Sequence, residues 1–410
     1  MPALHRIPAD PIDALRLRTS VKWRAYPDDV LPLFIAEMDY PLAGPIAEVL
    51  HDAARRSDTG YAGMLPAFAE SFAGFSAARF GWRVDPARVS LASDVGTGIV
   101  EVLRASIEPG SGVILTPPVY PPFFGYVGEA GHRLVEVPMH GGIDDGWALD
   151  LDGIDAAFAA GARAIVLCNP HNPLGYVPDA ASLASLAEIA HRHGAVVVAD
   201  EVHGALAYAS SAASGSSGAS GSPGASADAA FTPFLTVSDA AREVGVVVTG
   251  ATKAFNLAGL KAAAIVTDSE RADRVRSRMP EAVGWRASQF GVLASIAAFA
   301  EGTWWLDGVL GSLDDNRRLL ADLVADQLPG VRYRVPDATY LAWLDLGALG
   351  WGDDPAAHAL EHARVALSAG PEFGAPTGRG HARLNFACAP EVLAEAVQRL
   401  ADARVAPADA

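Results

Sequence analysis

Lys253 lies among small and apolar residues, in the stretch GATKAFNLAGLKAA at 250–263. The β-branched run VGVVVTG at 244–250 leads into it and predicts a buried strand. Surroundings of low polarity lower the pKa of a lysine, and such a lysine can act as a nucleophilic amine. An exposed lysine at the start of a helix would show the same local pattern. This stretch alone leaves both interpretations open.

Two more polar side chains are placed at the ends of predicted buried strands. Asp200 ends the run VVVAD, where an ionised carboxylate needs a cationic partner, either a pyridinium nitrogen or an arginine. Asn169 follows the run ARAIVLC and begins the segment NPHNPLG, whose prolines make the turn rigid. In open α/β sheets, ligands bind beyond the carboxyl ends of the strands. We therefore expect functional residues at these strand ends.

A third group of residues suits an anion. The segment SLASDVGTGIVEVL at 90–103 passes from a predicted strand through Gly96-Thr97-Gly98 into a helix. Free amides at the start of a helix bind anions, although this glycine motif alone is a weak signal. Thr252 and Lys261 would add a hydroxyl and a positive charge. Together these residues predict a phosphate site.

The elements that must position these residues alternate through the middle of the chain. Near-continuous apolar runs are typical of a parallel sheet that helices cover on both faces, so the fold class is α/β. Strands are expected at 112–117, 133–139, 162–170, 195–203, 244–250 and 262–268, with a helix at 179–194.

The ends of the chain differ in character from the middle. A long amphipathic helical segment is predicted at 290–328, a hairpin at 331–346 and a closing helix at 390–404. We divide the chain into an N-terminal arm that joins the small domain (1–45), a large domain (46–285) and a small α+β domain (286–410). The segment 209–230 is nearly all Ala, Ser and Gly, which predicts a mobile surface insertion in the large domain.

Composition excludes several functional classes. The 410 residues carry a formal net charge of −17, which argues against nucleic acid as a partner. No run of 18 apolar residues predicts a membrane span, and the N-terminus has no signal-peptide pattern. The two cysteines, Cys168 and Cys388, allow one disulfide, but free thiols in a cytoplasmic protein are favoured. Neither they nor the 11 histidines show metal-ligand spacing, so no metal is expected.

The order of these motifs resembles the fold-type I pyridoxal-phosphate enzymes. Their pattern is Asn-Pro-x-Asn-Pro-x-Gly, an aspartate about thirty residues on, and Thr/Ser-Lys about fifty beyond. The segment FGAPTGRGHARLNFA at 373–387 resembles the carboxylate-binding segment of the same family. The resemblance spans nearly the whole chain. It implies an aspartate-aminotransferase-like fold, with a mostly parallel seven-stranded sheet in the large, cofactor-binding domain.

Four segments resemble one group within this superfamily, the cystathionine β-lyases of the PatB/MalY type. They are SVKWRAYPDDVLPLFIAEMDYP (20–41), TGYAG (59–63), PPVYPPF (117–123) and DEVH (200–203). Aminotransferases of this fold usually have tyrosine where this chain has His203, which favours the lyase. The resemblance implies a cytoplasmic homodimer that cleaves L-cystathionine or related cysteine S-conjugates to a thiol, pyruvate and ammonia. Such a reaction belongs to methionine biosynthesis. An aminotransferase of class I/II and a regulatory protein that binds the cofactor are the alternatives.

The resemblance also assigns roles to individual residues. Lys253 binds pyridoxal phosphate covalently and acts as the base, and Arg383 binds the substrate carboxylate together with Asn169. Asp200 would contact the pyridine nitrogen of the cofactor and Asn169 its phenolic oxygen. Tyr120 would stack on the cofactor ring, with His203 nearby and Tyr61 reaching in from a neighbouring subunit. The residues around the phosphate would be Gly96, Thr97, Thr252 and Lys261. Tyr61 and Tyr120 are included among the catalytic residues.

Some of these residues also suit structural roles. Without the resemblance, Tyr120 and His203 are compatible with core positions, Tyr61 with the surface, and Arg383 with a structural ion pair. The family often has serine or proline just before Thr/Ser-Lys, where this chain has Gly250-Ala251. The resemblance therefore does not supply that phosphate contact here.

Overall fold

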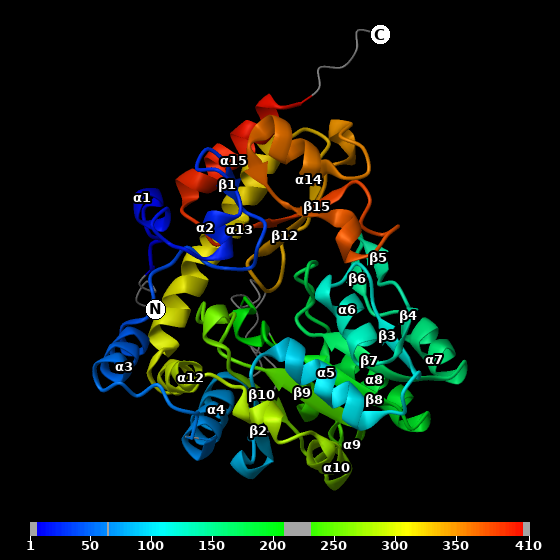
Figure 1. Cartoon of the computed structure of the whole chain (residues 1–410). Coiled ribbons are helices and arrows are strands. Elements are labelled where there is room, and N and C mark those ends of the chain that lie inside the picture. Colours follow the sequence, from blue (N-terminus) through cyan, green and yellow to red (C-terminus); the bar gives the residue numbers. More distant parts are fainter. Residues whose placement is uncertain (1–5, 64, 209–230, 405–410) are drawn as a thin grey trace, which may run out of the picture.

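A seven-stranded sheet forms the centre of the large lobe, the lower part of Figure 1. The computed structural model describes residues 6–63, 65–208 and 231–404, so the predicted insertion at 209–230 lies outside the described residues. The strand order is β2-β10-β9-β8-β7-β3-β4. The strands are β2 (Val89–Ala92), β3 (Gly112–Leu115), β4 (Arg133–Glu136), β7 (Ala162–Cys168), β8 (Val196–Asp200), β9 (Gly245–Thr249) and β10 (Ala263–Val266).

Five neighbouring strands of this sheet, from β4 to β9, run parallel, while β10 is antiparallel to both its neighbours. Each predicted strand is present, one or more residues shorter at one or both ends than its apolar run. The expected α/β class and mostly parallel sheet are confirmed.

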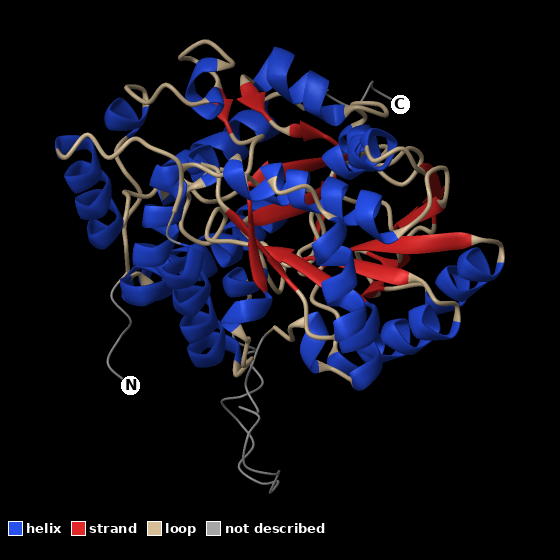
Figure 2. Ribbon diagram, turned by 60° about the horizontal axis from the view of Figure 1, so that its bottom comes forward, coloured by secondary structure: helices blue, strands red, loops and turns tan. Residues whose placement is uncertain are grey.

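Helices cover both faces of the sheet (Figure 2). Val113 and Leu115 of β3 belong to one apolar cluster and Ile114 to the other, so successive side chains face opposite layers. Burial on both faces explains why the strands are continuous apolar runs. One layer contains α5 (Val95–Ser106), α6 (Pro122–Glu129) and α10 (Glu270–Arg278), and the other contains α4 (Leu65–Phe80), α7 (Leu151–Ala159), α8 (Ala180–Arg192), α9 (Asp239–Val244) and α12 (Gln289–Glu301).

The segment predicted as one long helix at 290–328 is divided into α12 and α13 (Thr303–Gln327). The division falls at Gly302, where a Cβ atom would lie 2.6 Å from the carbonyl oxygen of Ala298 and 2.7 Å from the ring of Phe255. Only glycine allows the chain to turn so close to these groups. From there α13 runs up into the small lobe (Figure 1).

The small lobe is built on a four-stranded sheet in the order β11-β12-β15-β14. The predicted hairpin is present, because β11 and β12 pair antiparallel with Arg332 opposite Asp345. Leu31 of β1 pairs with Val365 of β13, which joins the N-terminal arm to this lobe. The elements are β1 (Leu31–Pro32), β11 (Arg332–Tyr333), β12 (Leu341–Asp345), β13 (Val365–Ala366), β14 (Ser368–Ala369), β15 (His381–Asn385), α14 (Pro355–His358) and the closing helix α15 (Pro390–Asp402).

The remaining elements lie at the margins of the two lobes. Short helices α1 and α2 belong to the N-terminal arm, and the β5–β6 hairpin projects from the large lobe beside the small one (Figure 1). Both cysteines are free and buried, as expected. None of the helices in the described residues is long and apolar enough to cross a membrane. The bounds are α1 (Ile12–Leu15), α2 (Val21–Arg24), α3 (Gly44–Arg55), α11 (Ala282–Trp285), β5 (His140–Gly142) and β6 (Gly146–Ala148).

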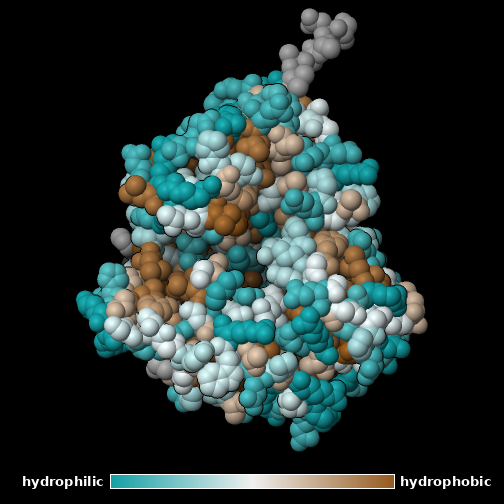
Figure 3. Space-filling view, in the orientation of Figure 1, coloured by the Kyte–Doolittle hydropathy of each residue, from teal (hydrophilic) through white to brown (hydrophobic). Residues whose placement is uncertain are grey.

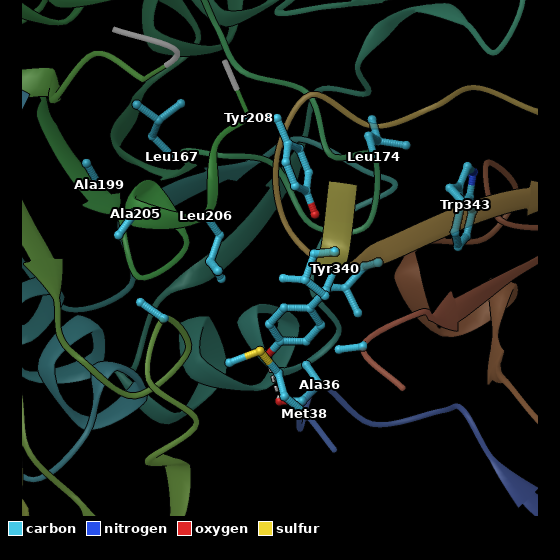
Figure 4. Packing of buried hydrophobic residues seen from close by; sticks show 14 of the residues in the cluster. Ala36, Met38, Leu167, Leu174, Ala199, Ala205, Leu206, Tyr208, Tyr340 and Trp343 are labelled. Carbon is cyan, nitrogen blue, oxygen red and sulfur yellow. Dashed lines mark hydrogen bonds between the residues drawn. The ribbon is translucent and has the colours of Figure 1, made fainter. Parts of the chain in front are cut away.

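Three parts of the chain meet between the lobes. Tyr340, beside β12, is fully buried, and its hydroxyl donates a hydrogen bond to the carbonyl oxygen of Ala36 at 3.0 Å (Figure 4). Leu206 of the large lobe and Met38 of the N-terminal arm are buried in the same cluster. The surface is hollowed between the two lobes in the view of Figure 3. The candidate site residues gather around this junction.

Candidate active site

Lys253 lies in the turn that follows β9, and its side chain is half-buried. Its Nζ donates to the carbonyl oxygen of Ala36 at 3.0 Å. Burial lowers the pKa of Lys253 to about 8, and the charge of Arg383 adds to this, while Glu37 and Asp200 oppose it. A lysine with a pKa of about 8 has about a tenth of its amine unprotonated at pH 7, far more than an ordinary lysine, and the free amine is the form that acts as a nucleophile or base.

Asp200 is the last residue of β8 and is buried. One carboxylate oxygen accepts a hydrogen bond from the backbone N–H of Val202 at 3.1 Å. Burial raises the pKa of Asp200 to about 7. No Lys, Arg or His side chain of residues 6–63, 65–208 and 231–404 forms an ion pair with this carboxylate. An arginine was one of the two cationic partners considered for Asp200 from the sequence. Among the described residues, no arginine forms an ion pair with this carboxylate.

Arg383 extends from β15 of the small lobe and is buried. Its Nη1 donates to the side-chain oxygen of Asn172 at 3.0 Å, and its Nη2 donates to the carbonyl oxygen of Phe34 at 2.8 Å and to the hydroxyl of Ser368 at 3.0 Å. Its Nε is buried without a hydrogen-bond partner among the described residues. Burial lowers the pKa of Arg383 to about 10. The guanidinium is fixed on neutral acceptors and can still bind an anion.

Asn169 follows β7 directly and is fully buried. Its side-chain nitrogen donates to Glu201 at 3.1 Å and to the carbonyl oxygen of Thr232 at 3.3 Å. Its side-chain oxygen is buried and has no partner in the described part of the chain. The backbone N–H of Asn169 donates to the backbone carbonyl oxygen of Asp200 at 2.9 Å, so the ends of β7 and β8 lie side by side. Asn169 and Asp200 therefore lie close together at the carboxyl ends of two neighbouring strands, and their functional role stays a prediction.

His203 and Tyr120 lie within electrostatic range of the same groups. His203 is buried, and burial, with the charges of Lys253 and Arg383, holds its pKa well below the ordinary value. Its ring is therefore neutral, and its Nδ1 has no hydrogen-bond partner among the residues described. Burial and the charge of Asp200 raise the pKa of Tyr120. The Tyr120 ring meets Phe123 edge-on, with centroids 5.3 Å apart.

Three of the four predicted phosphate residues, Gly96, Thr97 and Lys261, lie at the start of α5. Asp94 caps this helix by accepting a hydrogen bond from the backbone N–H of Thr97 at 2.8 Å, so that amide is already paired. The same carboxylate lies 3.6 Å from Nζ of Lys261, which adopts φ +57°. Tyr126, which the sequence reasoning missed, packs its hydroxyl against Gly96. Thr252 is half-buried beside Lys253.

Among the described residues, Tyr61 forms no hydrogen bond, aromatic contact or ion pair with any other predicted site residue. It is 82% exposed, and its ring meets Trp285 edge-on, with centroids 5.9 Å apart. An assignment to a neighbouring subunit stays a prediction.

Sequence reasoning also missed the contribution of the N-terminal arm. Carbonyl oxygens of Phe34 and Ala36 fix Arg383 and Lys253, and Glu37 acts electrostatically on Lys253. Ser20 donates a hydrogen bond to the Glu37 carboxylate at 2.8 Å. The segment FIAEMD around these residues was noted only for its resemblance. The carboxylate of Glu37 within an otherwise apolar run was the only sequence feature that could have indicated a site residue in this segment.

Comparison with known proteins places this geometry in context. The family described as "Aminotransferase class I and II" matches residues 28–400. The chain is 41% identical to a Mycobacterium leprae protein named "Putative cystathionine beta-lyase", over 96% of this chain and 97% of that one. It is 32% identical to the "Cystathionine beta-lyase" of Corynebacterium glutamicum, over 95% of this chain and 98% of that one.

A solved structure agrees with the fold as well. The crystal structure of a "putative plp-dependent beta-cystathionase" from Corynebacterium diphtheriae superposes with a TM-score of 0.87 at 32% identity. The match covers 97% of this chain and 98% of that one. The fold and the resemblance expected from the sequence are thereby confirmed, and the chain belongs to the aminotransferase class I and II family.

Proposed function

We propose that the protein is a pyridoxal-phosphate-dependent carbon–sulfur β-lyase that acts on L-cystathionine or a related cysteine S-conjugate. Relatives that carry the name cystathionine β-lyase cover nearly the whole chain at 30–42% identity. The single structural observation that carries the proposal is Asp200, a buried carboxylate near Lys253 with no cationic partner in the described chain. A buried carboxylate in this position calls for a bound cation.

The residues fit pyridoxal phosphate. Asp200 would pair with its protonated pyridine nitrogen. The Asn169 side-chain oxygen, which has no partner among the described residues, would lie against the phenolic oxygen of the cofactor. Lys253 would hold the cofactor covalently. Lys261, Thr252 and the start of α5 would hold the phosphate, with Asp94 already capping part of that helix end. Tyr120 and Tyr126 pack on the same apolar cluster as this helix, and the Tyr126 hydroxyl lies against Gly96.

When bound, the cofactor supplies an electron sink for the charge that develops at the substrate Cα. Arg383 binds the substrate carboxylate, and Asn172, Ser368 and Phe34 keep the guanidinium in place. Lys253, with its pKa lowered to about 8, takes the proton from Cα. Its neighbour His203 is neutral and adds no positive charge beside that amine.

Loss of a thiol from Cβ completes the proposed reaction. For L-cystathionine, the Cβ–S bond breaks, the sulfur leaves with a proton as homocysteine, and hydrolysis of the remaining three-carbon fragment gives pyruvate and ammonia. A class I/II aminotransferase would use the same lysine and arginine but would require a keto acid as second substrate. Requirement for a keto acid therefore separates the two functions.

The test is pyruvate release from L-cystathionine by the purified protein loaded with pyridoxal phosphate, with no keto acid added. We expect pyruvate and homocysteine in equal amounts, and no product from Lys253→Ala. Pyruvate from the Lys253→Ala variant at the wild-type rate would contradict the role of the lysine. Amino transfer that appears only with a keto acid would replace the lyase by an aminotransferase.

A second copy of the chain is the partner we propose. Tyr61, Trp285 and Leu65 are apolar or aromatic side chains, 82%, 61% and 41% exposed, and such a patch favours an interface. In a homodimer, Tyr61 would reach the cofactor of the partner. Light scattering of the wild type and of Trp285→Glu tests this, because the charge should shift a dimer toward monomer. We also propose that the protein is cytoplasmic and that its domains divide at residues 45 and 285.

A further inference from the structure

A cavity of about 430 Å³ lies away from the Lys253 cluster, at the edge where the two lobes meet. The β5–β6 hairpin of the large lobe forms one wall, and the segment between β11 and β12 of the small lobe forms the other. A volume of this size is in the range of small-molecule sites. The side chains that define its chemistry are His140, Asp145, Trp147, Tyr176, Arg334 and Asp337.

Arg334 supplies a cation to this cavity. Gly146 adopts φ +89°, and a Cβ atom there would lie 3.3 Å from Nη2 of Arg334, so the guanidinium packs directly on the hairpin backbone. Within the described residues, Arg334 forms no ion pair, whereas Arg332 is paired with Asp144 and Asp345. The Arg334 guanidinium is therefore available to a carboxylate.

The charge of the lining argues against one class of ligand and is compatible with another. Asp145 and Asp337 contribute two carboxylates against the one guanidinium of Arg334, so these three groups sum to a charge of −1. A phosphate, with two or more negative charges, is poorly matched to that balance. A zwitterion with one carboxylate and one ammonium suits it. Trp147 and Leu174 add an aromatic and an aliphatic surface to the same cavity.

We propose that this cavity binds a free α-amino acid with an apolar side chain. Its carboxylate pairs with Arg334, its ammonium group with Asp337 or Asp145, and its side chain packs on Trp147 and Leu174. Since Trp147 lies on the large lobe and Arg334 on the small lobe, the bound amino acid bridges the two lobes. This site is separate from the proposed reaction and does not depend on it.

The cavity wall is connected to the loop that holds Arg383. The carbonyl oxygen of Gly175 accepts hydrogen bonds from the backbone N–H groups of Asp337 at 2.9 Å and Ala338 at 3.0 Å. The same loop returns to His171 through a 2.7 Å hydrogen bond and carries Asn172, the partner of Arg383. Restraint of Asp337 by a ligand thus restrains the loop that orients the Arg383 guanidinium.

The experiment titrates L-leucine into the protein loaded with pyridoxal phosphate, with calorimetry and cofactor absorbance followed in parallel. Leucine has no leaving group on Cβ, and its binding at the cofactor changes the absorbance, whereas binding in the cavity gives heat alone. The variant is Arg334→Gln, and the matched control is Arg332→Gln. Arg332 is an exposed arginine two positions away, in β11, and it is not part of the cavity lining.

We expect the dissociation constant of the calorimetric event to rise about tenfold or more in Arg334→Gln, as for loss of a charged hydrogen bond. It should stay within about twofold of the wild type in Arg332→Gln, as for other surface changes. The size of the absorbance change at saturating leucine should be the same in all three proteins. Equal heat in the wild type and Arg334→Gln, or heat that only follows the absorbance, would overturn the proposal.

Discussion

Removal of the ion pair between Lys22 and Asp39 should destabilise the protein strongly. The two side chains are only 1% and 2% exposed, and the Lys22 Nζ lies 2.8 Å from Oδ1 of Asp39. The same Nζ donates to the carbonyl oxygen of Glu37 at 3.2 Å. Lys22→Met would leave the carboxylate buried and unpaired, which costs about 3–5 kcal/mol of the free energy of unfolding.

The loss should depend on pH in a known direction. Burial raises the pKa of Asp39 even with Lys22 beside it. A carboxyl group with a raised folded pKa favours folding most below its unfolded pKa of about 3.9, and that contribution is lost as pH rises through the folded value. Without Lys22 the folded pKa rises further. The cost of Lys22→Met should therefore be small in acid and reach its full size only at higher pH.

Denaturant unfolding of three variants provides the assay. Lys22→Met together with Asp39→Leu should recover most of the stability, since an apolar pair can replace a buried ion pair. The control is Arg6→Met, which breaks the exposed pair with Asp315, where the side chains are 44% and 57% exposed. That change should cost less than about 1 kcal/mol. A loss in Lys22→Met no larger than in the control, or no recovery in the double variant, would refute the reasoning.

Four further predictions concern the site and the loop beside it. Since burial lowers the pKa of Lys253 to about 8, cofactor uptake by the cofactor-free protein, followed by absorbance, should speed up as pH rises through about 8; a rate independent of pH would contradict this. Asn172→Ala removes an acceptor of Arg383 at 3.0 Å, and KM should rise about tenfold or more with little change in kcat. Asp200→Asn should lower kcat by about a hundredfold or more, as for loss of a group that stabilises charge in the transition state, and unchanged turnover would exclude its pairing role. Gly175→Ala should lower the unfolding midpoint, because Gly175 has φ +62° and a Cβ there would overlap Pro336.

The sheet and its strand ends were predictable from the sequence for a local reason. A strand buried on both faces must be apolar at every position, so runs such as VVVAD are visible without knowledge of their neighbours. A polar residue that ends such a run, like Asp200 or Asn169, is then conspicuous. Their proximity follows from the parallel order of β7 and β8, with Cys168 opposite Asp200.

The division at Gly302 was not predictable, because the amphipathic pattern continues on both sides of it. A glycine within a helical pattern is compatible with a continuous helix, and the lack of room for a Cβ atom at Gly302 comes from Phe255 and the carbonyl oxygen of Ala298. Both contacts are set by the fold. The capping role of Asp94 was likewise not predicted. Its carboxylate accepts a hydrogen bond at 2.8 Å from the Thr97 amide, which the sequence analysis had assigned to a phosphate site.

The part of the site that sequence reasoning missed consists largely of main-chain atoms. Carbonyl oxygens of Phe34 and Ala36 fix Arg383 and Lys253, and every residue has a carbonyl, so no residue type marks these positions. They reach the site because β1 pairs with β13 more than three hundred residues later, Leu31 opposite Val365. In the sequence, Lys22 precedes and Asp39 follows the segment that contains Phe34 and Ala36, so their ion pair closes this part of the N-terminal arm. Loss of that pair should therefore weaken the positions of Lys253 and Arg383 before it unfolds the rest of the chain.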